Sequence, residues 1–449
     1  MRPETARVLK PGPNIQGVGR WLLFAGLIQA LYFVASVVSV TPHYLYSDNR
    51  FYETPAWNLA QGRGFTIART EWEDPYLTRA YAGRHPGADL SHVPAVVFPP
   101  GYGFFLAAIY SLAGSRSHFA AVIANGLLMA VALAGLMILA RKTLHGSGQQ
   151  RLFLALCALF PFWAFWAARM VTDTLHIALM TWAVVLWTTG DVSWRRSLGV
   201  GVLMGLATLT RPYTLGLPAA FGIGWAIKGR GRGALLDAAC VTLVSGLIMG
   251  AWVARNHYYF GEPLVVSLTK GQGLWQATHY EADKGLFGNF DPAEVAAGLR
   301  ATGIVDAYRY EDNRRLRDLG LEKIKKAPFR FALRTLGLIP RLWIPTGSIF
   351  STFTKSLLIA WFALLFLALL YGLSRVIGSN DPVLEASSIV VLYYTFIFLF
   401  PGHVESRYVL PARGFSFLLI AAALSTAWTA SVRARLPRRW PPRRRLLTT

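Results

Sequence analysis

Two aspartates stand where a long apolar run meets a polar segment. Asp48 follows the apolar run 21–40, and Asp173 immediately precedes the run 174–190. A carboxylate held at the edge of a lipid bilayer is costly to desolvate, so such a residue is a candidate for function. The competing interpretation is structural, because an aspartate is also a common residue at the start of a helix. If both aspartates lie at one membrane face, a shared site with a carboxylate as general base explains the pair better than two separate caps.

Arginines also follow apolar runs. Arg211 lies in a Thr-Arg-Pro-Tyr segment, Arg255 in Arg-Asn-His-Tyr, and Arg407 in Glu-Ser-Arg-Tyr. For any one of them, the simpler interpretation is a long side chain that reaches from the membrane to water. Arginine is also the residue that grips phosphate through paired hydrogen bonds. Two acids and several arginines at one face predict a phosphate-bearing lipid and a hydroxyl group to be deprotonated.

The composition indicates the setting of these residues. Of the 449 residues, 54% are hydrophobic and only 15% are charged, and the mean hydropathy is +0.38. The net charge of +22 would suggest nucleic acid in a soluble protein, but most basic residues here lie in short stretches between apolar runs. That distribution is typical of membrane topology. We therefore expect an integral membrane protein whose partners do not include nucleic acid.

The apolar runs predict the fold class, an all-α membrane protein with about ten transmembrane helices. The first outer loop is expected to hold interfacial or re-entrant helices, and the second outer loop to be long. The candidate spans are 21–40, 119–140, 152–168, 174–190, 197–211, 212–228, 234–252, 353–373, 384–401 and 409–430. The outer loops are then 41–118 and 253–352, within one membrane module covering 1–430, and a basic tail follows at 431–449.

The basic residues orient this topology. With the N-terminus in the cytoplasm, basic residues fall in alternate connections and in the C-terminal tail, as expected for positive charges kept on the cytoplasmic side. The apolar segment 97–114 would invert every later loop if it crossed, so we expect it to re-enter or lie at the interface. We expect a multi-pass protein of a bacterial inner membrane with both termini cytoplasmic.

The stretch 309–341 does not follow the charge rule. It carries ten basic residues and four acids although the topology puts it outside. We expect an amphipathic helix with Phe329, Phe331, Leu333, Leu336 and Trp343 on its membrane side. It would serve as an interfacial anchor or, more specifically, as a guide for anionic lipid head groups.

Several short pieces occur in order along the chain: Asp48 with Tyr52, the helix end at 58–62, Pro-Pro-Gly-Tyr at 99–102, Asp173, Leu-Thr-Arg-Pro at 209–212, 255–261 and 406–411. Their order resembles that of the integral-membrane glycosyltransferases of superfamily C, near the protein O-mannosyltransferase and lipid A aminoarabinose-transferase branch. The resemblance covers about residues 20 to 430. One departure is that the family often has Asp-Glu where this chain has Asp48-Asn49, so a second acidic role would pass to Glu53 or be absent.

The resemblance implies a donor sugar carried on a polyprenyl phosphate and an acceptor hydroxyl from a glycan, lipid or protein. Attack on the anomeric carbon would invert its configuration and release the lipid phosphate. Asp48 would be the base, and Asp173 would orient the acceptor or share that role. The phosphate would be held by Arg255, Arg407, Arg211 and Lys270, and the substrate groove would include Tyr52, Glu53, Tyr102, Trp275, His403 and Tyr408. No metal-ligand spacing is present and no cofactor is certain, although a divalent cation is compatible with the resemblance.

Two other functions remain open. A transporter or flippase of polyprenyl lipids predicts inverted repeats and ionisable residues at mid-membrane, and neither is evident in the sequence. A polysaccharide ligase or polymerase would share the outer arginines but should lack an acid directly after the first helix. The sugar, the acceptor and the oligomeric state are not determined by the sequence.

Overall fold

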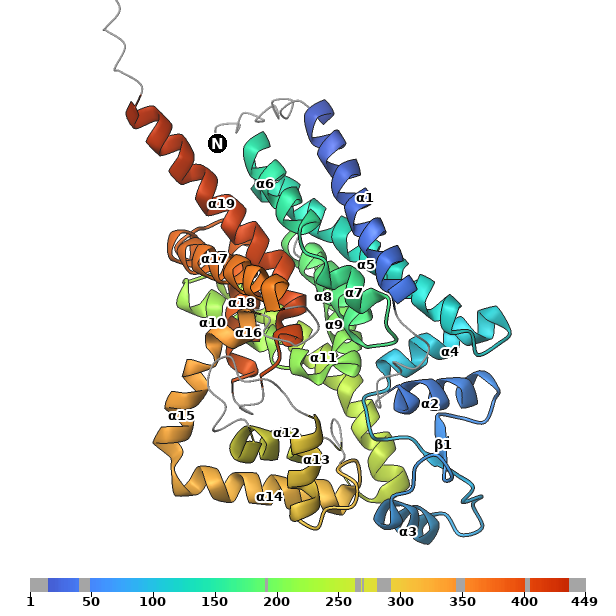
Figure 1. The fold of residues 1–449 in the computed structure, drawn as a ribbon. Helices are drawn as coiled ribbons and strands as arrows, with labels where there is room; N and C mark the ends of the chain where they lie inside the picture. The colour runs from blue at the N-terminus through green and yellow to red at the C-terminus, as the bar shows by residue number, and fades with distance from the viewer. Residues whose placement is uncertain are drawn as a thin grey trace, which may run out of the picture.

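The fold is a bundle of helices with a smaller layer of short helices and two strands at one end (Figure 1). The computed structural model describes residues 15–39, 49–189, 193–262, 268, 270–280, 292–344, 352–399 and 404–435. The bundle helices are α1 (Ile15–Ser39), α5 (His118–Thr143), α6 (Ser147–Ala158), α7 (Phe162–Ala167), α8 (Asp173–Thr189), α9 (Trp194–Thr210), α10 (Leu217–Ile227), α11 (Arg232–Phe260), α17 (Thr352–Val376), α18 (Pro382–Ile397) and α19 (Leu410–Arg435).

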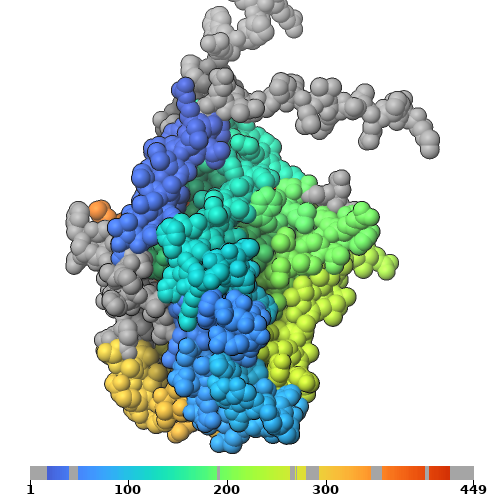
Figure 2. Space-filling view, turned by 90° about the vertical axis from the view of Figure 1, so that its right-hand side faces the viewer, coloured from blue at the N-terminus to red at the C-terminus, as the bar shows by residue number. Residues whose placement is uncertain are grey.

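Two stretches form the layer at the lower end of the bundle in Figure 1. The first holds α2 (Arg50–Ala60), β1 (Thr66–Ala68), α3 (Pro75–Arg84), β2 (His92–Pro94) and α4 (Gly101–Ala113), with β1 and β2 paired antiparallel. The second holds α12 (Lys270–Trp275), η2 (Gln276–Tyr280), α13 (Pro292–Ala301), α14 (Tyr310–Lys326), α15 (Pro328–Gly337) and α16 (Ile339–Trp343). Seen from the side, the first stretch, in blue, lies at the lower end of the molecule beside the yellow part of the second stretch (Figure 2).

The helical membrane fold predicted from the sequence is confirmed. Among the described residues, five helical segments are long and apolar enough to cross a membrane. They are Val18–Ser39, His118–Thr143, Arg232–Phe260, Ser356–Val376 and Ser406–Leu424. Helices also occur at the other expected spans, but they are shorter, so the count of ten spans stays a prediction. The apolar segment expected to re-enter forms the 13-residue α4, which is shorter than the span of a bilayer.

The predicted span 152–168 is not one continuous helix. It divides into α6 and α7 around Pro161, which cannot donate a backbone hydrogen bond. The carbonyl groups released by the break are satisfied by a single side chain, because Gln29 Nε2 donates to the carbonyls of Cys157 and Phe160 at 2.7 and 3.0 Å. A polar residue of α1 thus supplies the donors that lipid could not.

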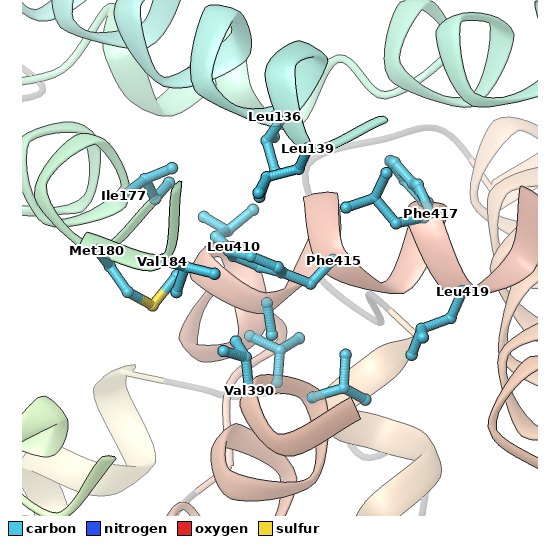
Figure 3. Packing of buried hydrophobic residues seen from close by; sticks show 14 of the residues in the cluster. Leu136, Leu139, Ile177, Met180, Val184, Val390, Leu410, Phe415, Phe417 and Leu419 are labelled. Carbon is cyan, nitrogen blue, oxygen red and sulfur yellow. The ribbon is translucent and has the colours of Figure 1, made fainter. Parts of the chain in front are cut away.

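The core is organised around α19. Its residues Ala412 to Ala423 are buried on every side, and α5, α6, α8, α17 and α18 all pack against it. Figure 3 shows Phe415 between Leu136 and Leu139 of α5, Met180 and Val184 of α8, and Val390 of α18. A helix that is apolar around its whole circumference is expected at such a central position.

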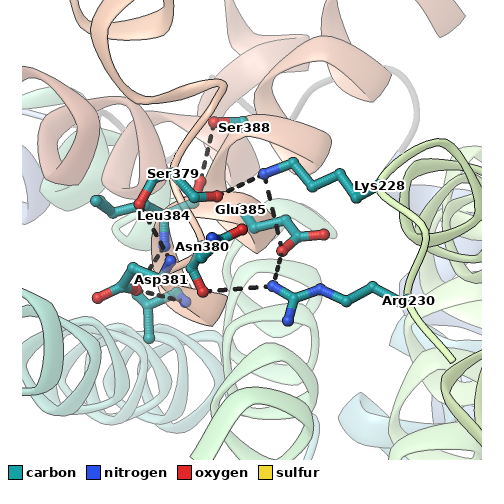
Figure 4. Close-up of polar contacts among 9 residues, drawn as sticks. Lys228, Arg230, Ser379, Asn380, Asp381, Leu384, Glu385 and Ser388 are labelled. Carbon is teal, nitrogen blue, oxygen red and sulfur yellow. Dashed lines mark hydrogen bonds and ion pairs between the residues drawn. The ribbon is translucent and has the colours of Figure 1, made fainter.

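A polar network ties α10 to α18 (Figure 4). Arg230 Nη2 lies 2.6 Å from Glu385 Oε2, and Lys228 Nζ donates to the carbonyl of Ser379 at 2.5 Å. Asp381 caps the start of α18 by accepting from the backbone of Val383 and Leu384. Lys228 and Arg230, which were expected in a cytoplasmic connection, thus link the end of α10 to the start of α18.

Candidate functional site

A buried ion pair joins the start of α8 to the end of α9. Asp173 is the first residue of α8 and has no exposed surface. Its Oδ2 lies 2.8 Å from Nη2 of Arg211, whose Nε donates to Thr172 Oγ1 at 2.9 Å. The other carboxylate oxygen, Oδ1, has no hydrogen-bond partner among the described residues. The N-terminal end of a helix favours a negative charge, so the position of Asp173 at the start of α8 suits a carboxylate.

The break after α9 fixes the direction of Arg211. Pro212 ends the helix, and the short 3-10 turn η1 (Pro212–Thr214) follows. One turn further along α8 from Asp173, His176 Nε2 lies 2.6 Å from the Tyr394 hydroxyl. Thr214 Oγ1 lies 3.1 Å from the same hydroxyl. This buried network connects α8, η1 and α18, and so holds the turn that presents the guanidinium group.

The partner of His176 Nδ1 bears on which ring nitrogen donates and which accepts. Nδ1 lies 3.2 Å from the carbonyl of Ala207, which can only accept. Nδ1 therefore carries a proton, and in the neutral tautomer Nε2 accepts from the hydroxyl of Tyr394. Through these two contacts the imidazole links α8 to α9 and α18.

The Pro-Pro-Gly-Tyr segment lies against this ion pair. A Cβ atom on Gly101 would come within 2.7 Å of Thr210 Oγ1 and 2.8 Å of the Thr210 backbone nitrogen. Glycine is therefore required for the start of α4 to contact the residue that precedes Arg211. The next residue, Tyr102, is fully buried, and its hydroxyl accepts from Asn125 Nδ2 at 3.0 Å.

Tyr102 lies between two acidic groups. Burial raises the pKa of its hydroxyl, and the negative charges of Asp173 and Glu53 raise this pKa further. Asn125, in the apolar helix α5, also donates to the carbonyl of Arg169 at 2.8 Å. The amide of Asn125 thus links α4 to the short connection that leads into Asp173.

Glu53 is held by basic residues around the start of α5. Its carboxylate forms an ion pair with Arg116 at 3.3 Å, lies within hydrogen-bond distance of the His118 ring, and accepts from the Tyr110 hydroxyl at 3.1 Å. Tyr52, one residue earlier, stacks on Phe98 with ring centroids 5.0 Å apart. Both residues were predicted in the substrate groove, and in the structure both make contacts within the layer that surrounds Tyr102.

Arg407 lies in a turn next to that of Arg211. It belongs to η4 (Ser406–Val409), pairs with Glu405 at 2.8 Å, and lies over the ring of Trp166. Tyr408 stacks on Phe398 at 4.7 Å, and its ring lies 6.3 Å from that of Tyr213, two residues after Arg211. The structure therefore brings the two predicted arginine turns into contact through their tyrosines.

Arg255 lies on a helix and not at the start of a loop. The predicted span ended at residue 252, but α11 continues to Phe260 and carries Arg255 into the lower layer. Its guanidinium donates to the carbonyls of Ala95 and Phe65 at 3.0 and 3.2 Å, and it stacks on Trp252 and Tyr259. These contacts fasten α11 to the β1–β2 hairpin.

The remaining predicted residues are dispersed. Lys270 is exposed at the start of α12. Trp275 is buried in a separate apolar cluster with Val295 and Leu316, so it packs inside the second stretch of the layer. Asp48 and His403 lie outside the described residues.

Sequence reasoning missed several members of this site, namely His176, Tyr394, Asn125, Arg116 and His118. Two of them carried a signal. Asn125 is a lone amide in a long apolar run, and His176 lies three residues after Asp173, on the same helical face. Among the described residues, no group of three His, Cys, Asp or Glu side chains is placed to hold a metal ion.

These features define a class, a multi-pass membrane bundle with a buried acid–arginine pair next to a layer of short helices. Comparison with known families then gives a more specific result. Residues 97–257 match the family model described as dolichyl-phosphate-mannose-protein mannosyltransferase. That stretch contains Tyr102, Asp173, Arg211 and Arg255. No curated protein matches the chain.

The fold is shared with two solved oligosaccharyltransferase structures. The archaeal oligosaccharyltransferase AglB from Archaeoglobus fulgidus, in complex with an inhibitory peptide and a dolichol-phosphate, is 15% identical, with a TM-score of 0.52 over 95% of this chain and 52% of that one. A structure of the Archaeoglobus fulgidus oligosaccharyltransferase tethered to an acceptor peptide gives 15% identity and a TM-score of 0.54 over 94% and 51%. Apo ArnT from Cupriavidus metallidurans is 16% identical, with a TM-score of 0.37 over 95% and 81%.

The chain spans about half the length of the oligosaccharyltransferase structures that it matches. At this level of identity the likeness to the oligosaccharyltransferases establishes the fold alone. With the family match, it confirms the resemblance of this chain to the superfamily C integral-membrane glycosyltransferases.

Proposed function

We propose that the chain is an inverting glycosyltransferase that moves a sugar from a polyprenyl-phosphate donor to an acceptor hydroxyl at the outer face of the membrane. The observation that carries the proposal is the buried Asp173–Arg211 pair beside the start of α4. A buried carboxylate with one unpartnered oxygen is poised to accept a hydrogen bond from a hydroxyl group. The guanidinium beside it suits the phosphate of the donor.

The reaction requires a base and a stabiliser of the leaving group. The acceptor oxygen forms a bond to the anomeric carbon while the bond from that carbon to the phosphate oxygen breaks. The hydroxyl proton passes to a carboxylate, and the electron pair leaves with the phosphate. We assign Asp48 as the base, with Asp173 orienting the acceptor or sharing the proton.

The phosphate is assigned to the arginines. Arg211 and Arg407 are favoured because their turns meet through Tyr213 and Tyr408. The backbone carbonyls of Ala95 and Phe65 already occupy part of the guanidinium of Arg255, so its contribution would be mainly its charge. Lys270 is also assigned to the donor phosphate, because its side chain is positively charged. Positive groups act most strongly where negative charge develops in a site that excludes water.

The proposed site faces the non-cytoplasmic side. The start of α1 and the end of α19 lie at the end of the bundle opposite the layer (Figure 1). If positive charges keep both termini in the cytoplasm, the layer and the Asp173–Arg211 pair face outward. The membrane is proposed to be a bacterial inner membrane, and the acceptor to be a glycan, a lipid or a protein.

Sugar transfer by the purified protein tests this proposal. The protein in liposomes would be given a panel of radiolabelled polyprenyl-phosphate sugars with bulk membrane acceptors. Transfer that is lost in Asp173→Asn and Asp48→Asn supports the proposal. Movement of the intact lipid across sealed vesicles without transfer would favour a flippase. Extension or ligation of a glycan from a polyprenyl-diphosphate donor alone would favour a polysaccharide polymerase or ligase.

A further inference from the structure

Helix α15 presents an apolar face that the protein leaves uncovered. Phe329, Leu333 and Leu336 recur at the spacing of one helical face and are 85%, 71% and 52% exposed. The opposite face is anchored, because Thr335 is buried and Arg334 bonds to the carbonyl of Ala277 in η2. The orientation of the helix is therefore fixed with its large apolar side chains outward.

Trp343 was expected on the same membrane face, and this prediction is wrong. Its ring is 1% exposed, and its indole nitrogen donates to Thr395 Oγ1 at 3.1 Å. The chain turns between α15 and α16, so Trp343 enters the bundle core while Phe329 stays outside. The amphipathic surface consequently ends with α15.

Helix α15 lies where the layer meets the bundle (Figure 1). It lies at the edge of the molecule, between α14 and the bundle (Figure 1). Among the elements, it packs chiefly against α14 and α16, its neighbours in the chain. On the candidate spans, exposed large apolar residues such as Leu23 and Val38 are the ones expected to meet lipid. The large apolar side chains of α15 are exposed to a similar extent.

Basic side chains flank the apolar face. Arg330 is exposed within α15, and Lys323, Lys325 and Lys326 are exposed in the last turn of α14. Of these, Lys326 pairs with Glu322. A helix with apolar residues on one side and lysine or arginine beside them is the pattern that binds an anionic lipid surface.

We propose that α15 docks on the non-cytoplasmic surface of the membrane that the bundle spans. Phe329, Leu333 and Leu336 would lie in the boundary between head groups and acyl chains, and the basic residues would contact anionic head groups. This contact would fix the second stretch of the layer relative to the bilayer. The expected depth of the three side chains is about 5–10 Å below the head groups.

Spin-label accessibility tests the docking directly. Single cysteines would replace Phe329, Leu333 or Leu336 in a full-length background carrying Cys157→Ala and Cys240→Ala. Asp318, exposed on α14, gives the matched control position. Each labelled protein would be placed in vesicles of phosphatidylcholine, with or without phosphatidylglycerol, and probed with oxygen and a water-soluble nickel chelate.

The three positions of α15 should favour oxygen over the chelate, whereas the label at 318 should favour the chelate. Phosphatidylglycerol should deepen the three labels, and a Lys325→Gln, Arg330→Gln variant should lose that deepening. Full access of the chelate to all three positions would overturn the proposal. Exclusion of both probes with spin–spin coupling between copies would also overturn it, because a second copy would then cover the face. Immersion that is independent of phosphatidylglycerol would refute the anionic contact.

Discussion

The Asp173–Arg211 pair allows stability and chemistry to be separated. Asp173 has no exposed surface and the side chain of Arg211 is only 11% exposed, so Asp173→Asn leaves a guanidinium without its counter-charge in a buried place. Loss of one partner of a buried pair costs about 3–5 kcal/mol. Loss of a carboxylate that orients or deprotonates the acceptor lowers the rate by about 10²–10⁴-fold. At about 1.4 kcal/mol for each factor of ten, this corresponds to about 3–5 kcal/mol of transition-state energy.

A double variant distinguishes the two effects. Arg211→Met added to Asp173→Asn removes the stranded charge, and replacement of both partners of a buried pair is often close to neutral. We expect the double variant to recover most of the lost stability, measured as the fraction that remains monodisperse after heating. Turnover, measured as transfer of radiolabelled sugar per folded molecule, should stay at the level of the single variant or below it.

A second buried pair provides the matched control. Asp237 pairs with Arg196, both are nearly buried, and the pair lies toward the opposite end of α11 from Arg255. Asp237→Asn should therefore cost a similar amount of stability and leave turnover per folded molecule close to that of the unmodified protein. If folded Asp173→Asn keeps turnover within about tenfold, or if the double variant restores turnover together with stability, Asp173 has only a structural role.

Three further predictions concern the support of the site. Gly101→Ala should reduce turnover and should lower thermal stability by about 1–3 kcal/mol, because the new Cβ meets Thr210. The control is Gly83→Ala, where a Cβ has open space; Gly114→Ala is unsuitable because φ is positive there. Gln29→Leu should lower thermal stability by about 1–3 kcal/mol, since the α6 carbonyls lose their donor; equal melting would contradict this. The hydrogen bond to Glu262 raises the pKa of Tyr76 to about 12. The stability that this bond contributes should therefore be complete below about pH 10 and fall between about pH 10 and 12. The melting temperature should decline over this range, and Tyr76→Phe should make the decline smaller.

The helical fold could be predicted because a bilayer imposes strong constraints on sequence. An apolar run such as 119–140 has few alternatives to a helix, and α5 covers it. The breaks were harder to predict. Nothing near Pro161 in the sequence shows that Gln29, far away in α1, stands ready to satisfy the carbonyls of a divided helix.

The candidate site was predicted in part, because residue type and membrane side are local properties while pairing is not. The face shared by Asp173 and Arg211 followed from the topology, but their contact depends on how α8 packs on α9. The role of Gly101 also needed the structure, since the close approach to Thr210 arises between segments more than a hundred residues apart. For Arg255 the sequence indicated a charge near the layer, but the carbonyl partners that occupy it were invisible.

The central position of α19 has a consequence for how the protein is made. Its segment Ser406–Leu424 has a mean hydropathy of 1.3, against 1.9 to 2.4 for the other four candidate spans, and 83% of it is buried. It also carries the buried polar residues Arg413 and Ser416. Such a helix gains little from lipid by itself, and it is the last of the described helices to leave the ribosome. The earlier helices must therefore wait in the membrane with an incomplete interior, and chains that stop before α19 should be short-lived substrates of membrane quality control.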